Sequence, residues 1–233
     1  AGVSATAPFK IKTLGKGLIY NNITGSTYNE VGYDENTDGS LVSGSSDNLR
    51  WEVVNVDNAA GTFGLLVRRG DDNSKNKIIL ETWNDLSLDP NSEGYIEKVI
   101  GNQYKSKAVD NGQYYITTTG EYVNRSKFIR VSDVNQTLNY LANDGSTVNS
   151  EGGVVFSGSL PSNQSGSFQG ATGGNVIGTG ASRDKYFENI AAGDSQGLTA
   201  ACYADSISIL GNQDEYVYNI ISAPGLIYEF GDH

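Results

Sequence analysis

The feature that most limits the fold is the spacing of short apolar runs along the chain. Runs rich in Val, Ile, Leu, Phe and Tyr alternate with stretches rich in Gly, Asn, Asp and Ser. Gly, Asn and Asp suit tight turns, and β-branched and aromatic residues suit a pleated sheet. The 233 residues include 29 Gly and 14 Tyr, in keeping with this pattern. The sequence therefore predicts a mainly β protein with some α-helix (α+β).

The apolar runs predict seven strands before the Gly-rich part of the chain. Two of them, Thr62–Arg69 and Lys77–Trp83, are separated by a stretch of turn-forming residues, Gly70–Asn76, and are expected to pair as an antiparallel hairpin. The other expected strands are Phe9–Leu14, Leu49–Val56, Gln113–Thr117, Phe128–Val131 and Gly153–Phe156.

The clearest helix signal is the segment Pro90–Ile100. Asp89 is a good N-cap, and Pro90 suits the first helical position, where an N–H is not needed. The segment carries an apolar stripe that predicts packing onto the sheet. Gly101 is expected to end the helix in a left-handed conformation. The stripe consists of Tyr95, Ile96, Val99 and Ile100.

The last part of the chain has a different pattern of apolar residues. Helices are expected at Asp184–Ala192 and Leu198–Leu210, followed by an apolar strand at Tyr216–Ala223. A helix followed by an apolar strand is the opening of an α/β unit. Residues 134–152 and 158–180, rich in Ser, Asn, Gly and Thr, are expected to be long loops.

These elements predict three regions. Residues 1–157 are expected to form an antiparallel β-sandwich or barrel-like domain, in which 105–151 is a candidate insertion. Residues 158–183 are expected to be a Gly/Ser-rich linker. Residues 184–233 are expected to be the start of an α/β segment that is left incomplete.

The charge and the rare residues exclude several classes of protein. The net charge of −11 disfavours a nucleic-acid partner, and no apolar run approaches the roughly 20 residues that span a bilayer. Cys202 is the only cysteine, so it has no internal disulfide partner, and it is expected to be a buried core residue. His233 is the only histidine, which argues against His-based catalysis and most transition-metal sites. The chain has no Met and begins at Ala1, so we expect a trimmed or proteolysed fragment.

Two short motifs suggest binding. Asp34–Gly39 has acidic residues at alternate positions and then Gly, like the first half of a calcium loop, but Ser45 stands where a bidentate Glu is needed. A solvated polar turn is the simpler interpretation. Arg69-Gly70-Asp71 matches an integrin-type tripeptide, although Gly is expected in a hairpin turn for conformational reasons alone.

Other motifs do not add up to a site. The Gly-rich run Gly170–Gly180 lacks the Gly-Lys-Ser/Thr ending of a phosphate loop. Carboxylates that could act in hydrolysis fall in turns and strands with no nucleophile or base beside them. We therefore assign no catalytic, cofactor-binding or metal-binding residue, and we expect that the chain is not an enzyme. The carboxylates are Asp71, Asp72, Glu81 and Asp85.

Four glycosylation-type sequons are present, and chance explains them in a chain this rich in Asn, Ser and Thr. They begin at Asn22, Asn124, Asn135 and Asn163.

One long stretch resembles a known family. Leu65–Arg69 and Ile78–Glu81 read as paired strands, and they are followed by Trp83-Asn84-Asp85 and then by Leu86–Ile100 (LSLDPNSEGYIEKVI). This order of a hairpin, an LSLDP stretch and a helix resembles the tail sheath proteins of contractile-tailed bacteriophages. Gly152–Gly158 and Asp214–Gly225 resemble two later strands of that family.

The resemblance implies a structural subunit that polymerises around the tail tube and contracts to drive the tube through the host envelope. It implies other sheath subunits, the tail tube protein and the baseplate as partners. It also implies location in the virion and, during assembly, in the host cytoplasm. In the family the inter-subunit contacts come largely from terminal arms and the α/β domain, so this chain alone is expected to be monomeric, with no membrane or cofactor.

Two other functions fit some of the residues. A β-sandwich carbohydrate- or receptor-binding module would use exposed aromatic rings for stacking, although strand aromatics are more often buried. The aromatic candidates are Trp51, Trp83, Tyr114 and Tyr115. A carboxylate-dependent hydrolase would use the acidic residues named above.

Overall fold

The computed structural model describes most of the first 136 residues and shorter parts of the remainder. The described residues are 7–15, 20–22, 35–42, 44–136, 150–151, 154–155, 160–168 and 200–223. The expected helix Asp184–Ala192, the Gly-rich run Gly170–Gly180 and His233 lie outside them.

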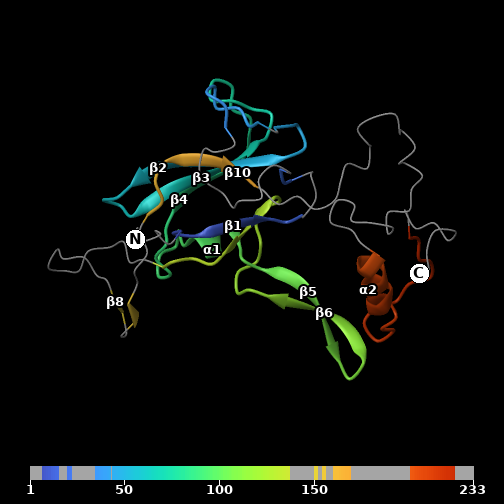
Figure 1. Ribbon diagram of the computed structural model, residues 1–233. Coiled ribbons are helices and arrows are strands. Elements are labelled where there is room, and N and C mark those ends of the chain that lie inside the picture. Colours follow the sequence, from blue (N-terminus) through green and yellow to red (C-terminus); the bar gives the residue numbers. More distant parts are fainter. Residues whose placement is uncertain are drawn as a thin grey trace, which may run out of the picture.

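The described elements are mainly antiparallel strands in open sheets, which confirms the predicted mainly β, α+β class (Figure 1). In chain order they are β1 (Lys10–Thr13), β2 (Leu49–Asp57), β3 (Thr62–Arg69), β4 (Ile79–Leu86), α1 (Ile96–Ile100), β5 (Tyr104–Asp110), β6 (Gln113–Thr119), β7 (Ile129–Ser132), β8 (Ser150–Glu151), β9 (Val154–Val155), β10 (Gln164–Ser167) and α2 (Ala200–Leu210). None of the described helices is long and apolar enough to cross a membrane.

The largest sheet has the strand order β10-β2-β3-β4, and its neighbouring strands are antiparallel. β3 and β4 form the expected hairpin, with Leu65 opposite Trp83. Side chains alternate between the two faces of a strand, so Phe63, Leu65 and Val67 of β3 point to the same side. All three are buried, which makes this side the core face of the sheet.

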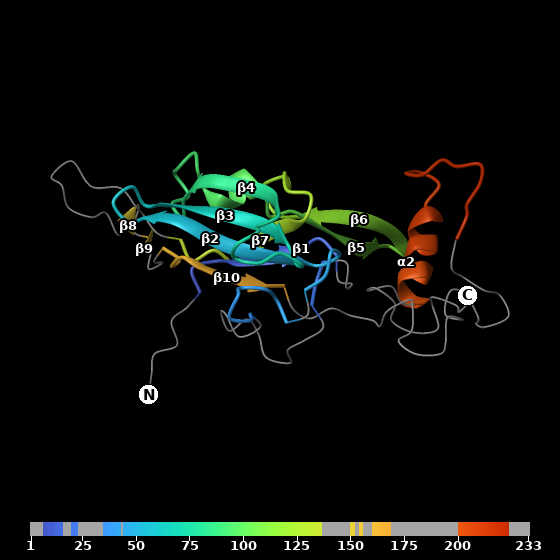
Figure 2. The ribbon, with the colours of Figure 1, turned by 90° about the horizontal axis from the view of Figure 1, so that it is seen from above.

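A second layer covers that face. β1 and β7 pair as a two-stranded antiparallel sheet, and α1 packs against β7 and β4. Ile129 and Val131 of β7 join the buried cluster of the main sheet, and the ring of Phe9 stacks on Phe63 with centroids 5.4 Å apart. Figure 2 shows β1 and β7 against β2 and β3. The apolar core therefore lies between the two layers.

β5 and β6 form a separate hairpin that extends from the sheets toward α2 (Figures 1 and 2). Its turn is Asn111-Gly112, with φ values of 48° and 82°. Positive φ at both central residues is typical of the type I′ turn, which matches the twist of a hairpin. Only the β6 part was expected from the sequence; β5, with Lys at alternate positions, was not.

The predicted helix at Pro90–Ile100 is wrong in its first half. Tyr95 forms a parallel bridge with Ser87, and the Ile96 N–H donates to the Ser87 carbonyl at 2.9 Å, so the helix begins only at Ile96. Asp89 accepts a bond from the Asn91 N–H and stabilises a turn rather than a helix end. Gly94 fits there because a Cβ would collide with the Asp85 carbonyl.

The apolar stripe of this helix is positioned as expected, but the helix end is not. Tyr95, Ile96 and Ile100 are buried, and Val99 is half-buried. Gly101 has φ 109° and ψ 150°, so it is not the left-handed cap predicted. Its carbonyl accepts a bond from the Val131 N–H at 2.8 Å, which ties the end of α1 to β7.

Two expectations about the second half of the chain are also wrong. Gln164–Ser167, expected to be loop, is strand β10, because it pairs with β2 from Arg50 to Val53. Tyr216–Ala223, expected to be a strand, is not paired, and Val217 and Ile220 are 94% and 87% exposed. A strand needs a neighbour for its backbone hydrogen bonds, and the described residues supply none there.

The helix expected at Leu198–Leu210 is confirmed as α2. The division into three regions stays a prediction.

The second layer can be tested through α1. Ile96 is fully buried, so Ile96→Ala removes core contacts and is expected to lower the free energy of unfolding by about 2–5 kcal/mol. Val99→Ala is the matched control in the same helix, and it should cost clearly less because Val99 is half-buried. Urea denaturation followed by fluorescence measures both. An unchanged midpoint for Ile96→Ala would remove α1 from the core.

Candidate functional site

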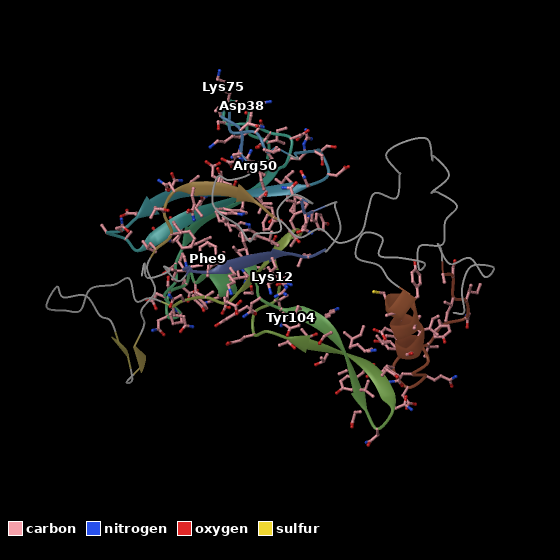
Figure 3. The ribbon with its side chains drawn as sticks, viewed as in Figure 1. Phe9, Lys12, Asp38, Arg50, Lys75 and Tyr104 are labelled. Carbon is pink, nitrogen blue, oxygen red and sulfur yellow. The ribbon has the colours of Figure 1, made fainter. Side chains whose placement is uncertain are left out.

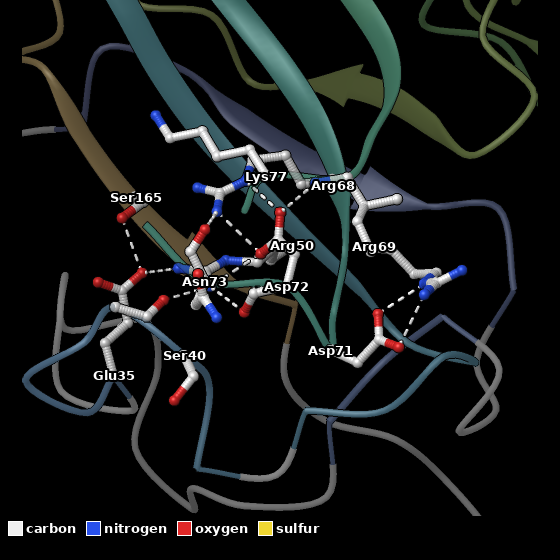
Figure 4. A network of polar contacts seen from close by, with 12 residues as sticks. Glu35, Ser40, Arg50, Arg68, Arg69, Asp71, Asp72, Asn73, Lys77 and Ser165 are labelled. Carbon is white, nitrogen blue, oxygen red and sulfur yellow. Dashed lines mark hydrogen bonds and ion pairs between the residues drawn. The ribbon is translucent and has the colours of Figure 1, made fainter. Parts of the chain in front are cut away.

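The most polar buried place in the described residues lies on the outer face of the main sheet. Arg50 of β2 stands directly opposite Arg68 of β3, and both side chains are buried. Asp72, in the turn after β3, is 1% exposed and lies between them. Figure 4 shows these groups with the residues around them. Two like charges opposite each other on a sheet are destabilising unless an anion neutralises them.

Asp72 bonds to both arginines through short contacts. Its Oδ1 accepts bonds from Arg50 Nη1 at 3.1 Å and from Arg68 Nη2 at 2.8 Å, and its Oδ2 accepts from Arg68 Nε at 2.7 Å. Oδ2 also accepts from the Ile78 N–H at 2.9 Å. The carboxylate thus links β2, β3 and both ends of the β3–β4 turn.

Two further carboxylates complete the network. Glu52 Oε2 accepts from Arg68 Nη1 at 2.8 Å, and Glu52 Oε1 lies 2.7 Å from Lys77 Nζ. Glu35 pairs with Arg50 and accepts a bond from the Ser165 hydroxyl of β10 at 2.7 Å. Three cations therefore meet three carboxylates, and the charges cancel. We call these six residues the Asp72 network: Glu35, Arg50, Glu52, Arg68, Asp72 and Lys77.

A network whose charges balance is suited to holding the fold together, although the buried Arg50 Nε has no hydrogen-bond partner among the described residues. A catalytic carboxylate needs a free oxygen near a substrate, whereas both oxygens of Asp72 are used by protein donors. The network fastens the Glu35–Leu41 segment, whose ends form an antiparallel bridge, onto the sheet. The Gly39 carbonyl accepts a bond from Arg50 Nη1 at 2.5 Å.

This placement changes the interpretation of the calcium-like motif. Asp34 lies outside the described residues, and Glu35 is used by Arg50. Asp38 accepts a bond from the Ser40 hydroxyl at 2.6 Å, and this bond and the Ser40 N–H lower the pKa of its carboxyl. No group of three or more His, Cys, Asp or Glu side chains in the described residues is placed to hold a metal ion.

The Arg-Gly-Asp tripeptide also forms local structure. Arg69 Nε and Nη2 donate to the two carboxylate oxygens of Asp71 at 2.5 and 2.9 Å, so the two charged groups face each other. The Gly70 N–H donates to the Asn48 carbonyl at 2.8 Å, and a Cβ on Gly70 would collide with the Asn48 side chain. The motif therefore has a structural reason for its glycine.

The structure does not bring the four candidate carboxylates together. Asp72 belongs to the buried network, and Asp71 faces Arg69. Glu81 accepts bonds from the Ser126 hydroxyl at 2.6 Å and from the Lys127 N–H at 2.9 Å. Asp85 has φ 54° in the strand before α1. Each carboxylate has a different neighbourhood, so they do not form an acid–base pair.

The four candidate aromatic residues are not one stacking platform. Trp51 and Trp83 pack against the core as partly buried side chains, and the Trp51 ring lies over Gly166 of β10. Tyr114 and Tyr115 are on the separate β5–β6 hairpin and, as neighbours in a strand, point to opposite faces.

The remaining polar candidates are used locally or lie on the surface. Asn22 is buried and accepts a bond from the Asn48 side chain. Asn124 donates to the Gln103 carbonyl, the Asn135 N–H donates to the Pro8 carbonyl, and Asn163 accepts from the Val56 N–H. Cys202 is half-buried on α2, so its expected place in the core is wrong.

The comparisons with known proteins add no relative. No family model matches the chain, and neither the curated proteins nor the solved structures contain a match.

The Asp72 network yields a test with an internal control. Asp72→Asn removes the charge that two buried arginines share, so we expect a loss of about 3–5 kcal/mol in the free energy of unfolding. Asp71→Asn makes the same change one residue earlier, at an exposed pair, and its urea midpoint should stay close to that of the wild type. Equal midpoints for the two variants would show that the network does not hold the fold.

Proposed function

We propose that the chain is part of a structural, non-enzymatic subunit of a contractile bacteriophage tail sheath. In this proposal it is the β-rich part of a longer subunit that polymerises around the tail tube and contracts to drive the tube through the host envelope. Its partners would be other sheath subunits, the tail tube protein and the baseplate. Its location would be the virion and, during assembly, the host cytoplasm.

One observation carries the proposal: the stretch that resembles the family folds as one unit. From β3 through β4, the Ser87–Tyr95 bridge and α1, the elements follow one another without a break. This unit supplies much of the buried core, including Leu65, Leu86 and Ile96. The residues that resemble the family therefore lie largely in the core, where close packing limits which side chains fit.

The use of the charged groups is consistent with a structural role. The most buried charges of the described residues neutralise one another in the Asp72 network. The tripeptide and the aromatic residues that favoured adhesion or saccharide binding are used in turns, in the core or on opposite faces of a hairpin. No observation in the described residues favours the carbohydrate-binding alternative over the sheath.

The proposal is tested by locating the chain in phage particles. Antibodies raised against the purified chain should label tails along their length by electron microscopy, in particles whose genome encodes it. Antibodies pre-absorbed with the chain are the control and should give no label. Label confined to the tail fibres or the capsid, together with a saccharide signal on a glycan array, would support the binding-module alternative instead.

A further inference from the structure

A second charged cluster lies on the opposite layer, and its charges do not cancel. On the β1–β7 sheet, Lys12 stands directly opposite Arg130. The neighbouring residues in these strands, Ile11 and Val131, pack against the core or lie within it, so Lys12 and Arg130 point to the outer face. Within the described part of the chain, neither side chain has a carboxylate within ion-pair distance.

Other groups extend this cluster. Lys10 is two residues before Lys12 and so is on the same face; its contact is Asp133, at 3.4 Å between two exposed side chains. The Arg130 guanidinium lies over the ring of Tyr104, 4.8 Å from its centroid. Tyr104 itself is 44% exposed. We call these four residues the basic face: Lys10, Lys12, Tyr104 and Arg130.

The basic face is unusual because it costs stability in a chain with an excess of acidic residues. Like charges directly opposite on a sheet are destabilising, and the chain has 27 Asp and Glu against 16 Lys and Arg. Lysines on β1 alone have a simple explanation, since Lys protects an open strand edge from aggregation. Arg130 is not explained in this way, because its guanidinium lies over the Tyr104 ring.

The geometry points to a docking surface for an acidic protein segment on this face. Two features favour that partner: among the described residues neither Lys12 nor Arg130 has a carboxylate within ion-pair distance, and the two cations stand directly opposite each other on the outer face of the β1–β7 sheet. The contact with the Tyr104 ring uses the face of the guanidinium group and not its N–H donors, so these donors can bind a carboxylate. The inference is independent of the proposed function, because it rests on β1, β7 and Tyr104 alone.

A substitution at Lys75 provides the matched control. Lys75 lies in the β3–β4 turn at the far side of the main sheet from Lys12 and is exposed (Figure 3). Lys75→Glu and Lys12→Glu change the net charge by the same amount. Lys12→Glu also places opposite charges across the β1–β7 pair, so it should not lower the denaturation midpoint, and any loss of binding cannot be attributed to unfolding.

The experiment measures binding of a fluorescein-labelled oligoglutamate peptide to the full chain by anisotropy at low ionic strength, where charge contacts are least screened. We expect the wild type to bind, Lys12→Glu and Arg130→Gln to weaken binding by about tenfold, and Lys75→Glu to leave it within about twofold. No binding by the wild type, or equal weakening by Lys75→Glu, would overturn the inference. Displacement of the peptide by an equal concentration of inorganic phosphate would also overturn it, because the face would then be a small-anion site.

Discussion

The structure depends on one buried carboxylate shared by two arginines. An antiparallel sheet can leave one face to water. Here the Glu35–Leu41 segment and the β3–β4 turn cover part of the outer face. Arg50 and Arg68 lie under this cover and would repel each other without Asp72. Forming a buried ion pair adds little net stability, whereas removing one of its partners costs several kcal/mol, about 3–5. The contact therefore acts mainly by fixing the geometry of the groups that it joins. It fixes where the turn and the segment lie.

The two layers consequently use charge in opposite ways. On the main sheet Arg50 and Arg68 are buried and neutralised within the chain. On the β1–β7 sheet Lys10 pairs with Asp133 at the surface, whereas Lys12 and Arg130 have no carboxylate within ion-pair distance among the described residues. The distribution of ion pairs thus differs between the two layers.

The apolar pattern of the sequence was enough to predict β2 and β3 to within a residue and to place β4 and α2, because each has a strong local signal. The strand expected at Lys77–Trp83 is shifted in the structure, where β4 runs from Ile79 to Leu86. It failed where the structure depends on distant residues. β10 reads Gln-Ser-Gly-Ser and becomes a strand only through β2, with Gly166 making room for the Trp51 ring. The Asp72 network left only a faint signal, an Arg in each of two strands that contribute to the core, and the sequence does not show which carboxylate approaches these arginines. Tyr216–Ala223 fails for the converse reason, since strong β propensity without a partner strand gives an exposed segment.

Native-state hydrogen exchange at single amides tests whether the Asp72 network fastens the β3–β4 turn to the main sheet. The Ile78 N–H, bonded to Asp72 Oδ2 at 2.9 Å, should exchange only through global unfolding, with the same free energy as the core amides of Leu65 and Val67. The Lys75 amide, bonded at 3.0 Å to the Asn73 side chain in the exposed part of the same turn, provides the internal reference and should exchange faster. Fast exchange at Ile78, matching that of Lys75, would contradict the account, because the turn would then open without disturbing the sheet.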